Sequence, residues 1–374
     1  MKFNVSSEKL FQQLQAVSRV VANKSTLKIL ECILFDLSGN ILTLTASDGE
    51  TTIRTAIDVD NAEGEGKVAF GAKLLIDTMK EFPAQPLTFA IDDYTFGMII
   101  NSVNGKYSFV GVNGNEYPEM PKEEEGCHHI TMQSKVLLNA INKTIFCTAD
   151  DELRPVMNGI NFDLTEDHIT LVATDAHRLV RYNNYSIKSP EPVNFILPKK
   201  PANVLRTVLT KDEEEVEITF GQKNARFEFN RTLIICRQIE GRYPNYNGVI
   251  PQNNSNCVII DRLNLLAACK RTAVFANNTT ALLKLELTEN NLTISAQDID
   301  FSTSAEESIQ CSYSGNPIAI GFKGTILSEL LGNVDSSEVE IRLMDSTRAG
   351  LILPTENEEN EDLLMLLMPM LLNE

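Results

Sequence analysis

The sequence has no tryptophan, only four histidines and no cysteine pair spaced as C-x-x-C, and each of these gaps excludes a class of protein. Its seven cysteines are scattered singly, which argues against a disulfide framework and against a structural zinc site. A Gly-rich phosphate loop is also missing, which argues against nucleotide hydrolysis. No run reaches the roughly 18 apolar residues of a membrane span. Because the N-terminus carries no secretion signal, we expect a cytoplasmic protein.

Positive charge is scarce as well. The 33 Lys and Arg residues face 51 Asp and Glu residues, so the net charge is −18. Taken alone, this imbalance predicts repulsion from nucleic acid. With 374 residues, of which 43% are hydrophobic, the chain has the size of two or three ordinary globular domains.

One hairpin pattern occurs three times, at intervals of about 125 residues. Residues 33–48, 160–175 and 283–298 each contain two alternating apolar runs around a polar turn, and each copy ends on an aspartate. One helix candidate precedes each hairpin and a second follows it: 7–21, 71–81, 133–147, 198–211, 261–275 and 322–333. The pattern predicts an α+β protein of three repeated domains, each with two helices packed on antiparallel sheets. We place these domains at 1–122, 127–252 and 257–374, with polar linkers between them.

The scarce positive charge is concentrated in the predicted helices. Four of the six carry a net positive charge and none carries a net negative one. One explanation is that lysine is common on any solvated helix face. The other is that the three domains present their helices on one side, where the summed field would hold a polyanion through its phosphates, without sequence preference.

Three short motifs within this repeat resemble the β subunits of bacterial DNA polymerase III, the sliding-clamp family. They read ATDAHRL at 173–179, EGRYPNY at 240–246 and LMPM at 367–370. The resemblance covers the whole chain and implies a DNA-clamp fold that forms a ring as a head-to-tail homodimer, with helices lining the hole. A size estimate agrees, because six helices of ~10 Å side by side leave a bore of ~9 Å, whereas twelve leave ~28 Å. Only the larger bore admits a duplex.

The resemblance further implies a processivity factor with no catalytic activity, no cofactor and no metal, which encircles double-stranded DNA and tethers the replicative polymerase. The polymerase and the clamp loader would bind through short linear peptides in a cleft between the second and third domains. Matched position by position, the cleft residues are Met157, Thr174, His177, Arg178, Leu179, Pro244, Val249, Leu366, Met368, Pro369, Met370 and Leu371. The implied DNA contacts are Lys24, Arg154, Lys199 and Lys200, and the implied dimer interface includes Lys106, Phe109, Val274 and Phe275.

Several of these segments also have a purely structural interpretation. Residues 363–372 could form a buried terminal strand, and Val274 and Phe275 could be core residues of their helix. The acidic run 356–362 is expected to be a solvated loop. The sequence departs from the family pattern at Ala176, where Gly is frequent, at Leu371, where Arg is common, and at the end Leu372-Asn373-Glu374. These departures bear on peptide affinity and specificity.

The alternative from another class is a cytoplasmic β-rich enzyme or ligand-binding protein with a site around Asp175, His177 and Arg178. The repeat argues against it. Each hairpin copy ends in an aspartate, but no histidine recurs beside Asp48 or Asp298. A recurring aspartate without a recurring base does not make an acid/base site.

Overall fold

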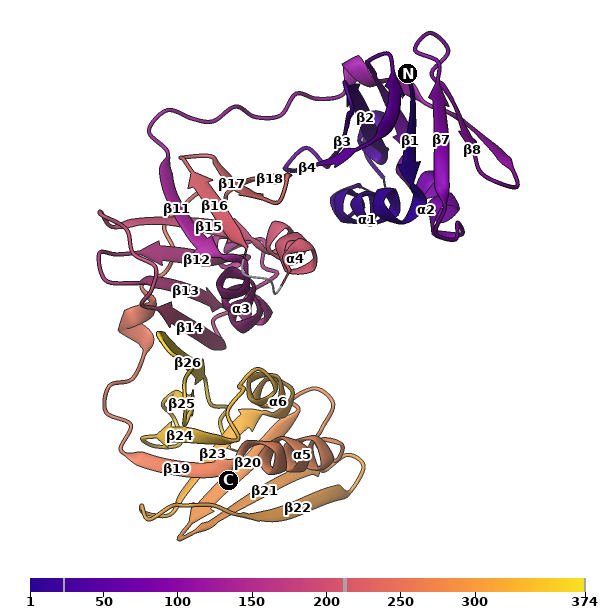
Figure 1. Cartoon of the computed structure of the whole chain (residues 1–374). Helices are drawn as coiled ribbons and strands as arrows, with labels where there is room; N and C mark the ends of the chain where they lie inside the picture. Colours follow the sequence, from indigo (N-terminus) through magenta and orange to yellow (C-terminus); the bar gives the residue numbers. More distant parts are fainter. Residues whose placement is uncertain (23, 211–213, 373–374) are drawn as a thin grey trace. The chain divides into compact units, whose positions relative to one another are not determined.

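The computed structural model describes residues 1–22, 24–210 and 214–372 (Figure 1). The contacts between these residues group them into two compact units. The first unit contains residues 1–138 and 200–238, and the second contains residues 139–199 and everything from 239 onward. Asn373 and Glu374 of the altered chain end, and Lys211 of one predicted helix, lie outside the described residues. The second of the three repeated domains is therefore divided between the two units.

The first unit contains two antiparallel sheets. The five-stranded sheet has the order β5 (Asp60–Glu63), β1 (Lys2–Ser6), β7 (Pro86–Ile91), β8 (Gly97–Asn101) and β9 (Lys106–Val110). The nine-stranded sheet has the order β10 (Val112–Asn113), β6 (Gly66–Gly71), β2 (Cys32–Ser38), β3 (Ile41–Ser47), β4 (Thr51–Asp58), β18 (Thr232–Arg237), β17 (Asn224–Phe229), β16 (Glu215–Phe220) and β11 (His128–Gln133).

The second unit repeats this plan. Its eight-stranded sheet has the order β15 (Val193–Pro198), β12 (Gly159–Leu164), β13 (Ile169–Thr174), β14 (Arg178–Asn184), β26 (Glu361–Leu367), β25 (Gly350–Pro354), β24 (Glu338–Leu343) and β19 (Asn256–Asp261). Its four-stranded sheet has the order β22 (Thr303–Gln310), β21 (Asn291–Asp298), β20 (Leu282–Thr288) and β23 (Ile318–Lys323).

All six predicted α-helices form, each slightly shorter than expected. They are α1 (Ser7–Ser18), α2 (Ala72–Lys80), α3 (Ser134–Thr144), α4 (Lys199–Val208), α5 (Arg262–Ala273) and α6 (Gly324–Gly332). Figure 1 shows α1 beside α2 and α5 beside α6, which agrees with their contacts. In α1, Leu10, Leu14 and Val17 are buried toward β3 and β4, as their three-and-four spacing predicts.

The three repeated hairpins are confirmed as β2–β3, β12–β13 and β20–β21. In the first, Ser38 pairs with Ile41, so Gly39 and Asn40 form a two-residue turn. Gly39 has a φ of +54°, the left-handed conformation that such a turn needs and that glycine adopts without a steric penalty.

Both large sheets cross a domain boundary. In the first unit, β4 of the first domain pairs with β18 of the second domain, with Ile53 opposite Ile234. In the second unit, β14 of the second domain pairs with β26 of the third, with Val180 opposite Met365. Because the middle domain contributes strands to both sheets, contacts group the chain into two units although the sequence repeats three times.

The acidic run 356–362 is a loop only in its first part. Residues 356–360 are exposed, as expected for a solvated loop. Glu361 and Asp362 instead begin β26, where Glu361 accepts a 2.5 Å hydrogen bond from the Tyr182 hydroxyl and Asp362 pairs with Arg181 at 3.1 Å. The prediction was wrong for these two residues because strand pairing with β14 supplies partners for their charges.

No helix in the described part of the chain is long and apolar enough to cross a membrane. In the same residues, no cluster of three or more His, Cys, Asp or Glu side chains is placed to hold a metal ion.

The shared sheet predicts that the two parts of the first unit unfold together. Replacing Ile234, which is fully buried, with Ala should reduce the free energy of unfolding by about 2–4 kcal/mol in urea denaturation. Amide exchange should rise in β3 and β4 as well as in β16–β18. Ile41→Ala, at a position 45% exposed, should change stability by less than about 0.5 kcal/mol. Loss of protection confined to β16–β18 would contradict a shared unit.

Candidate functional site

An apolar cluster covers one face of the eight-stranded sheet in the second unit. We call this cluster the apolar patch, and its buried members are Val172, Leu179, Ile196, Tyr243, Ile250, Ala349, Leu351, Leu364 and Leu366. The segment from Ile239 to Ile250 packs against this face, which we call the loop face to distinguish it from the face that contacts the helices. The patch therefore draws its residues from both the second and the third repeat.

Strand register explains why these residues meet. Leu179 of β14 lies opposite Leu366 of β26, and on its other side Leu179 lies opposite Thr174 of β13. Residues paired across an antiparallel sheet point to the same face, so all three side chains belong to the loop face. Three of the predicted cleft residues, Thr174, Leu179 and Leu366, are thus brought together, and all three are buried.

Other predicted cleft residues are the chain neighbours of residues that belong to the patch or pack against it. Met157 follows Val156 and Pro244 follows Tyr243, while Val249 precedes Ile250. Val249 is 58% exposed and Met157 and Pro244 are half-buried, so they leave apolar surface accessible beside the patch.

The chain end continues from β26 past the same region. The Met368 amide donates to the His177 carbonyl oxygen at 2.9 Å, and the Met370 amide donates to the Gly321 carbonyl oxygen at 2.8 Å. These two backbone hydrogen bonds fix the segment, in which Pro369 and Met370 are half-buried. Met368 is 44% exposed and Leu371 81% exposed. The structural interpretation of residues 363–372 therefore holds for 363–367, which form a buried strand, whereas Met368 and Leu371 leave apolar side chains exposed.

Asp175 has a structural role that accounts for its recurrence in the three repeats. One carboxylate oxygen accepts hydrogen bonds from the amides of His177 and Arg178, at 2.9 and 3.0 Å. Asp48 and Asp298 accept the equivalent bonds in the other two turns. An aspartate is retained at each site because its short side chain closes the turn between two strands.

Ala176 occupies the one position in this turn that suits glycine. Its φ is +74°, a left-handed conformation that costs an L-residue with a Cβ roughly 1–2 kcal/mol. Glycine would adopt this conformation without that penalty. The turn keeps its hydrogen bonds with alanine at this position, since the Ala176 amide donates to the Thr174 hydroxyl at 3.2 Å.

Arg178 connects the turn to the third repeat. Its guanidinium donates to Asp175 at 3.0 Å, to Glu329 of α6 at 2.6 Å and to the Phe146 carbonyl oxygen at 2.8 Å. With 11% of the side chain exposed, this network is well shielded from water. The side chain thus belongs to the helix side of the sheet, and Arg178 contributes to the loop face through its backbone alone.

The rival acid/base site receives no support from this geometry. The Asp175 carboxylate is occupied by the turn and by Arg178, while the His177 side chain is exposed. Burial raises the pKa of the neighbouring Cys147 thiol well above its ordinary value, which keeps it protonated and makes it a poor nucleophile.

The predicted DNA contacts are surface residues, and three of them pair with aspartates. Arg154 pairs with Asp151 at 2.8 Å, Lys199 pairs with Asp150 at 2.6 Å, and Lys200 pairs with Asp48. Lys24, Arg154 and Lys200 are exposed and Lys199 is half-buried. Ion pairs of this kind contribute about 0–1 kcal/mol, so the aspartates hold these cations only weakly.

Three of the four predicted interface residues lie on accessible surface. Val274 is 79% exposed and Phe275 41% exposed, which excludes the interpretation of both as core residues of their helix. Lys106 is exposed, whereas Phe109 is buried at 8% on the edge strand β9.

Sequence reasoning missed most of the patch floor. Val172, Leu351 and Leu364 were not singled out, although residues 363–367 form a continuous apolar run. A strand that is apolar at every position is covered on both faces, and this signal could have identified the loop face as packed.

Comparison with known proteins gives one consistent result. Family models of the DNA polymerase III beta subunit match residues 1–121 (N-terminal domain), 131–245 (central domain) and 247–370 (C-terminal domain). The beta sliding clamp of Pseudomonas aeruginosa is 27% identical over 98% of this chain and 99% of its own. That of Staphylococcus aureus is 25% identical over 98% of each chain.

Solved structures agree over the full length. The DNA polymerase III subunit beta of Pseudomonas aeruginosa has a TM-score of 0.93 at 27% identity, with 100% of both chains covered. A sliding clamp from the same organism, bound to griselimycin, has a TM-score of 0.94 at 26% identity, again with full coverage of both chains.

The strained turn gives a prediction about Ala176. Replacing it with Gly removes the left-handed penalty of about 1–2 kcal/mol and adds a backbone entropy cost of about 0.5–1 kcal/mol. We expect Ala176→Gly to be neutral or to stabilise the fold by up to about 1 kcal/mol in urea denaturation. Ala267→Gly, inside α5, should destabilise by about 1 kcal/mol. Equal destabilisation by both variants would show that the turn is not strained.

Proposed function

Because the chain belongs to the DNA polymerase III beta subunit family, the bacterial sliding clamps, we propose that two copies close head to tail into a ring around double-stranded DNA. The ring tethers the replicative polymerase and stays on DNA because leaving requires an interface to open. Binding strength is then secondary, and interactions with phosphates can remain weak enough for sliding.

The observation that carries this proposal is the repeated strand junction. The first and second repeats join through β4 and β18, and the second and third join through β14 and β26. In each case the strand that directly follows the repeated hairpin pairs with the last strand of the following repeat. The equivalent strands left over are β22 of the third repeat and β9 of the first, and each is the terminal strand of its sheet among the described residues. A second copy would supply the missing partner at both edges.

The two junctions also define a register for this pairing. Leu367 lies opposite Arg178 and Cys236 lies opposite Thr51, with Arg178 and Thr51 at the same position of their repeats. Thr303 is the equivalent residue of the third repeat, because it pairs with Asp298, the aspartate that corresponds to Asp48 and Asp175.

On β9, Phe109 is the equivalent of Cys236 in β18 and Leu367 in β26. Each of the three is buried and pairs with the first buried residue of the preceding strand, which is Met98, Ala225 or Gly350. Phe109 then lies opposite Thr303 of the second copy. Counting along antiparallel strands from that pair brings Lys106 opposite Glu306.

The surfaces beside both edges suit such an interface. Exposed apolar side chains flank them, namely Tyr107, Val110, Val274, Phe275, Ile299 and Phe301. Burial of these side chains by a second copy would favour association by about 25 cal/mol per Å² of apolar surface. Since one edge binds the other, the contact is heterologous and must close after two copies to avoid a filament.

Partner proteins bind, we infer, at the apolar patch. A buried floor that includes Leu179 and Leu366, beside the exposed side chains of Val249 and Met368, suits a short apolar peptide. Methionine adapts its shape to varied ligands, which fits a site that serves the polymerase and the clamp loader in turn. The griselimycin complex of the Pseudomonas relative shows that a clamp of this fold accepts a ligand.

A clamp of this kind works in the cytoplasm and catalyses no reaction. The only chemistry that it requires is electrostatic attraction on the inner side and apolar docking at the patch. The aspartates of the three turns support this view because each is used as a structural cap.

Retention on DNA tests the ring directly. The protein, loaded by its clamp loader, should remain on nicked circular DNA through gel filtration and leave once the DNA is linearised. Equal retention on both forms would exclude a ring.

The predicted DNA-facing lysines are tested by charge reversal. Changing Lys24, Lys199 and Lys200 to Glu should impair loading while the dimer stays intact. The slope of log affinity for DNA against log salt concentration should become shallower by about 0.9 for each phosphate that the protein no longer neutralises. The matched control replaces Lys2, Lys122 and Lys188, three exposed lysines outside the helices, with Glu. An equal effect of both triple variants would remove the assignment of these lysines.

The register predicts a charge exchange across the dimer interface. Lys106→Glu should place two carboxylates opposite each other at both interfaces, at about 1 kcal/mol each, and raise the dimer dissociation constant about 30-fold. Lys106→Glu combined with Glu306→Lys should return the constant to within about 3-fold of the original. Equilibrium sedimentation measures both values, with Lys188→Glu as the control. Failure of the double variant to recover would disprove the register.

A further inference from the structure

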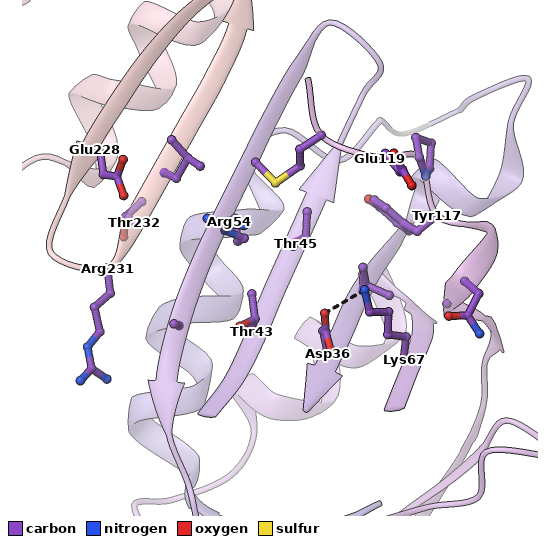
Figure 2. Close-up of a pocket in the computed structure, with 17 residues that line it drawn as sticks. Asp36, Thr43, Thr45, Arg54, Lys67, Tyr117, Glu119, Glu228, Arg231 and Thr232 are labelled. Carbon is purple, nitrogen blue, oxygen red and sulfur yellow. Dashed lines mark ion pairs between the residues drawn. The ribbon is translucent and has the colours of Figure 1, made fainter. Parts of the chain in front are cut away.

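The first unit has a hollow of about 640 Å³ on the loop face of its nine-stranded sheet (Figure 2). Strands β2, β3, β4 and β6 provide the floor, β17 and β18 one side, and residues 114–120 the other. We call this hollow the polar groove. Nothing in the clamp function proposed above uses it.

The polar groove occupies the same place in its sheet as the apolar patch does in the other unit. Arg54 lies opposite Thr45 on one side and opposite Leu233 on the other. Arg181 lies opposite Val172 and Leu364 in the same way. Tyr117 and Tyr243, from the two matching Tyr-Pro motifs, stand at the edge of the two sites. The two sites therefore overlap at equivalent positions of the repeat, where Thr45 corresponds to Val172 and Leu233 to Leu364.

The chemistry of the two positions differs. Thr45 stands where the apolar patch has Val172, and Thr52 stands where it has Leu179. Arg226, opposite Ile235, stands where the patch has Leu351, opposite Leu366. Of these three residues only Thr45 lines the polar groove, where Thr43, Lys67 and Glu228 add further polar groups. An apolar peptide that fits the patch would therefore leave polar groups without partners in the groove.

Arg54 is a charged residue at the centre of the groove (Figure 2). Asp36 pairs with Lys67 at 3.2 Å and Arg231 pairs with Asp58 at 2.8 Å, so these charges have partners. Within the described residues, Arg54 makes no ion pair or side-chain hydrogen bond. Figure 2 shows its side chain rising from β4 between the strand of Thr45 and that of Thr232. A guanidinium in this position can accept a carboxylate through two parallel hydrogen bonds.

Two further features restrict the ligand. Glu119 and Glu228 also line the groove without an ion pair in the described part of the chain, and they favour a basic group beside the acidic one. Leu34, Leu233 and Met120 supply apolar surface next to Arg54. The ligand should therefore combine an acidic, an apolar and a basic side chain within a few residues.

The wall of the groove is fixed before any ligand binds. The Tyr117 hydroxyl accepts a hydrogen bond from the Ser47 amide at 3.0 Å and donates to the Cys32 carbonyl oxygen at 3.3 Å. Tyr117 is 7% exposed and packs against Leu30, Leu34 and Ala69. A preformed wall lowers the ordering cost of binding.

We propose that the polar groove is a second peptide-docking site, which takes a partner segment with an acidic side chain on Arg54 and adjacent apolar and basic residues. It would let one clamp subunit hold two partners that carry different peptide signatures. The two sites would not compete for one peptide, because the aliphatic floor of the patch has no partner for the acidic and basic side chains that the groove binds.

Methionine methyl NMR on the full-length protein tests this site. The probe is the blocked peptide acetyl-Gly-Lys-Leu-Glu-Gly-amide, which has no net charge. We expect a saturable shift of the Met120 methyl resonance, at least 10-fold weaker binding to Arg54→Ala, intermediate binding to Arg54→Lys and unchanged binding to Arg19→Ala. The same peptide with Gln in place of Glu should bind at least 10-fold more weakly.

Three results would overturn the proposal: no saturable Met120 shift at millimolar peptide, equal binding to Arg54→Ala, or shifts confined to Met368 and Met370. The last result would show that the peptide uses the apolar patch instead. Because Arg54 is exposed, its replacement should leave the fold intact, and the remaining methionine resonances check this in the same spectrum. The measurement needs neither DNA nor a closed ring, so its outcome is independent of the proposed clamp function.

Discussion

Backbone pairing between the edges of neighbouring repeats is the constraint from which the rest of this structure follows. A strand edge leaves amides and carbonyls without partners, and each repeat presents two such edges. Pairing β4 with β18 and β14 with β26 satisfies four of them and creates two long sheets. The same constraint leaves β9 and β22 as terminal strands of their sheets, which is the basis of the proposed head-to-tail dimer.

Extending a sheet across a domain boundary also creates the surfaces that can recognise partners. Each junction brings two rows of side chains together on the loop face, where a Tyr-Pro segment meets them. In one unit Leu179 lies opposite Leu366, and at the same positions in the other unit Thr52 lies opposite Ile235. One backbone arrangement thus supports two chemistries, since pairing depends on the main chain and leaves the exposed side chains free to diverge.

Much of this architecture is local and could be predicted from the sequence. The alternating runs around Gly39 and the heptad-like spacing of Leu10, Leu14 and Val17 specify their hairpin and helix with neighbouring residues alone. The sheet junctions depend on strands far apart in the chain, and no local pattern reports them. The same limit explains the errors at Glu361 and Asp362, whose partners Tyr182 and Arg181 come from the preceding repeat. Motif resemblance located Leu179 and Leu366 of the patch floor but missed Val172 and Leu364, because these two look like ordinary strand residues.

The division of the middle repeat between the two units has a consequence for the protein as a physical object. A fragment cut at residues 127 and 252 would keep all of its own helices and strands. It would nevertheless leave β14 and β18 as unpaired edge strands and expose the aliphatic side chains beside Leu179. Each outer repeat, cut off in the same way, would expose only one newly unpaired strand edge. Of the three segments, the central one should therefore be the least able to survive in isolation and the most prone to self-association.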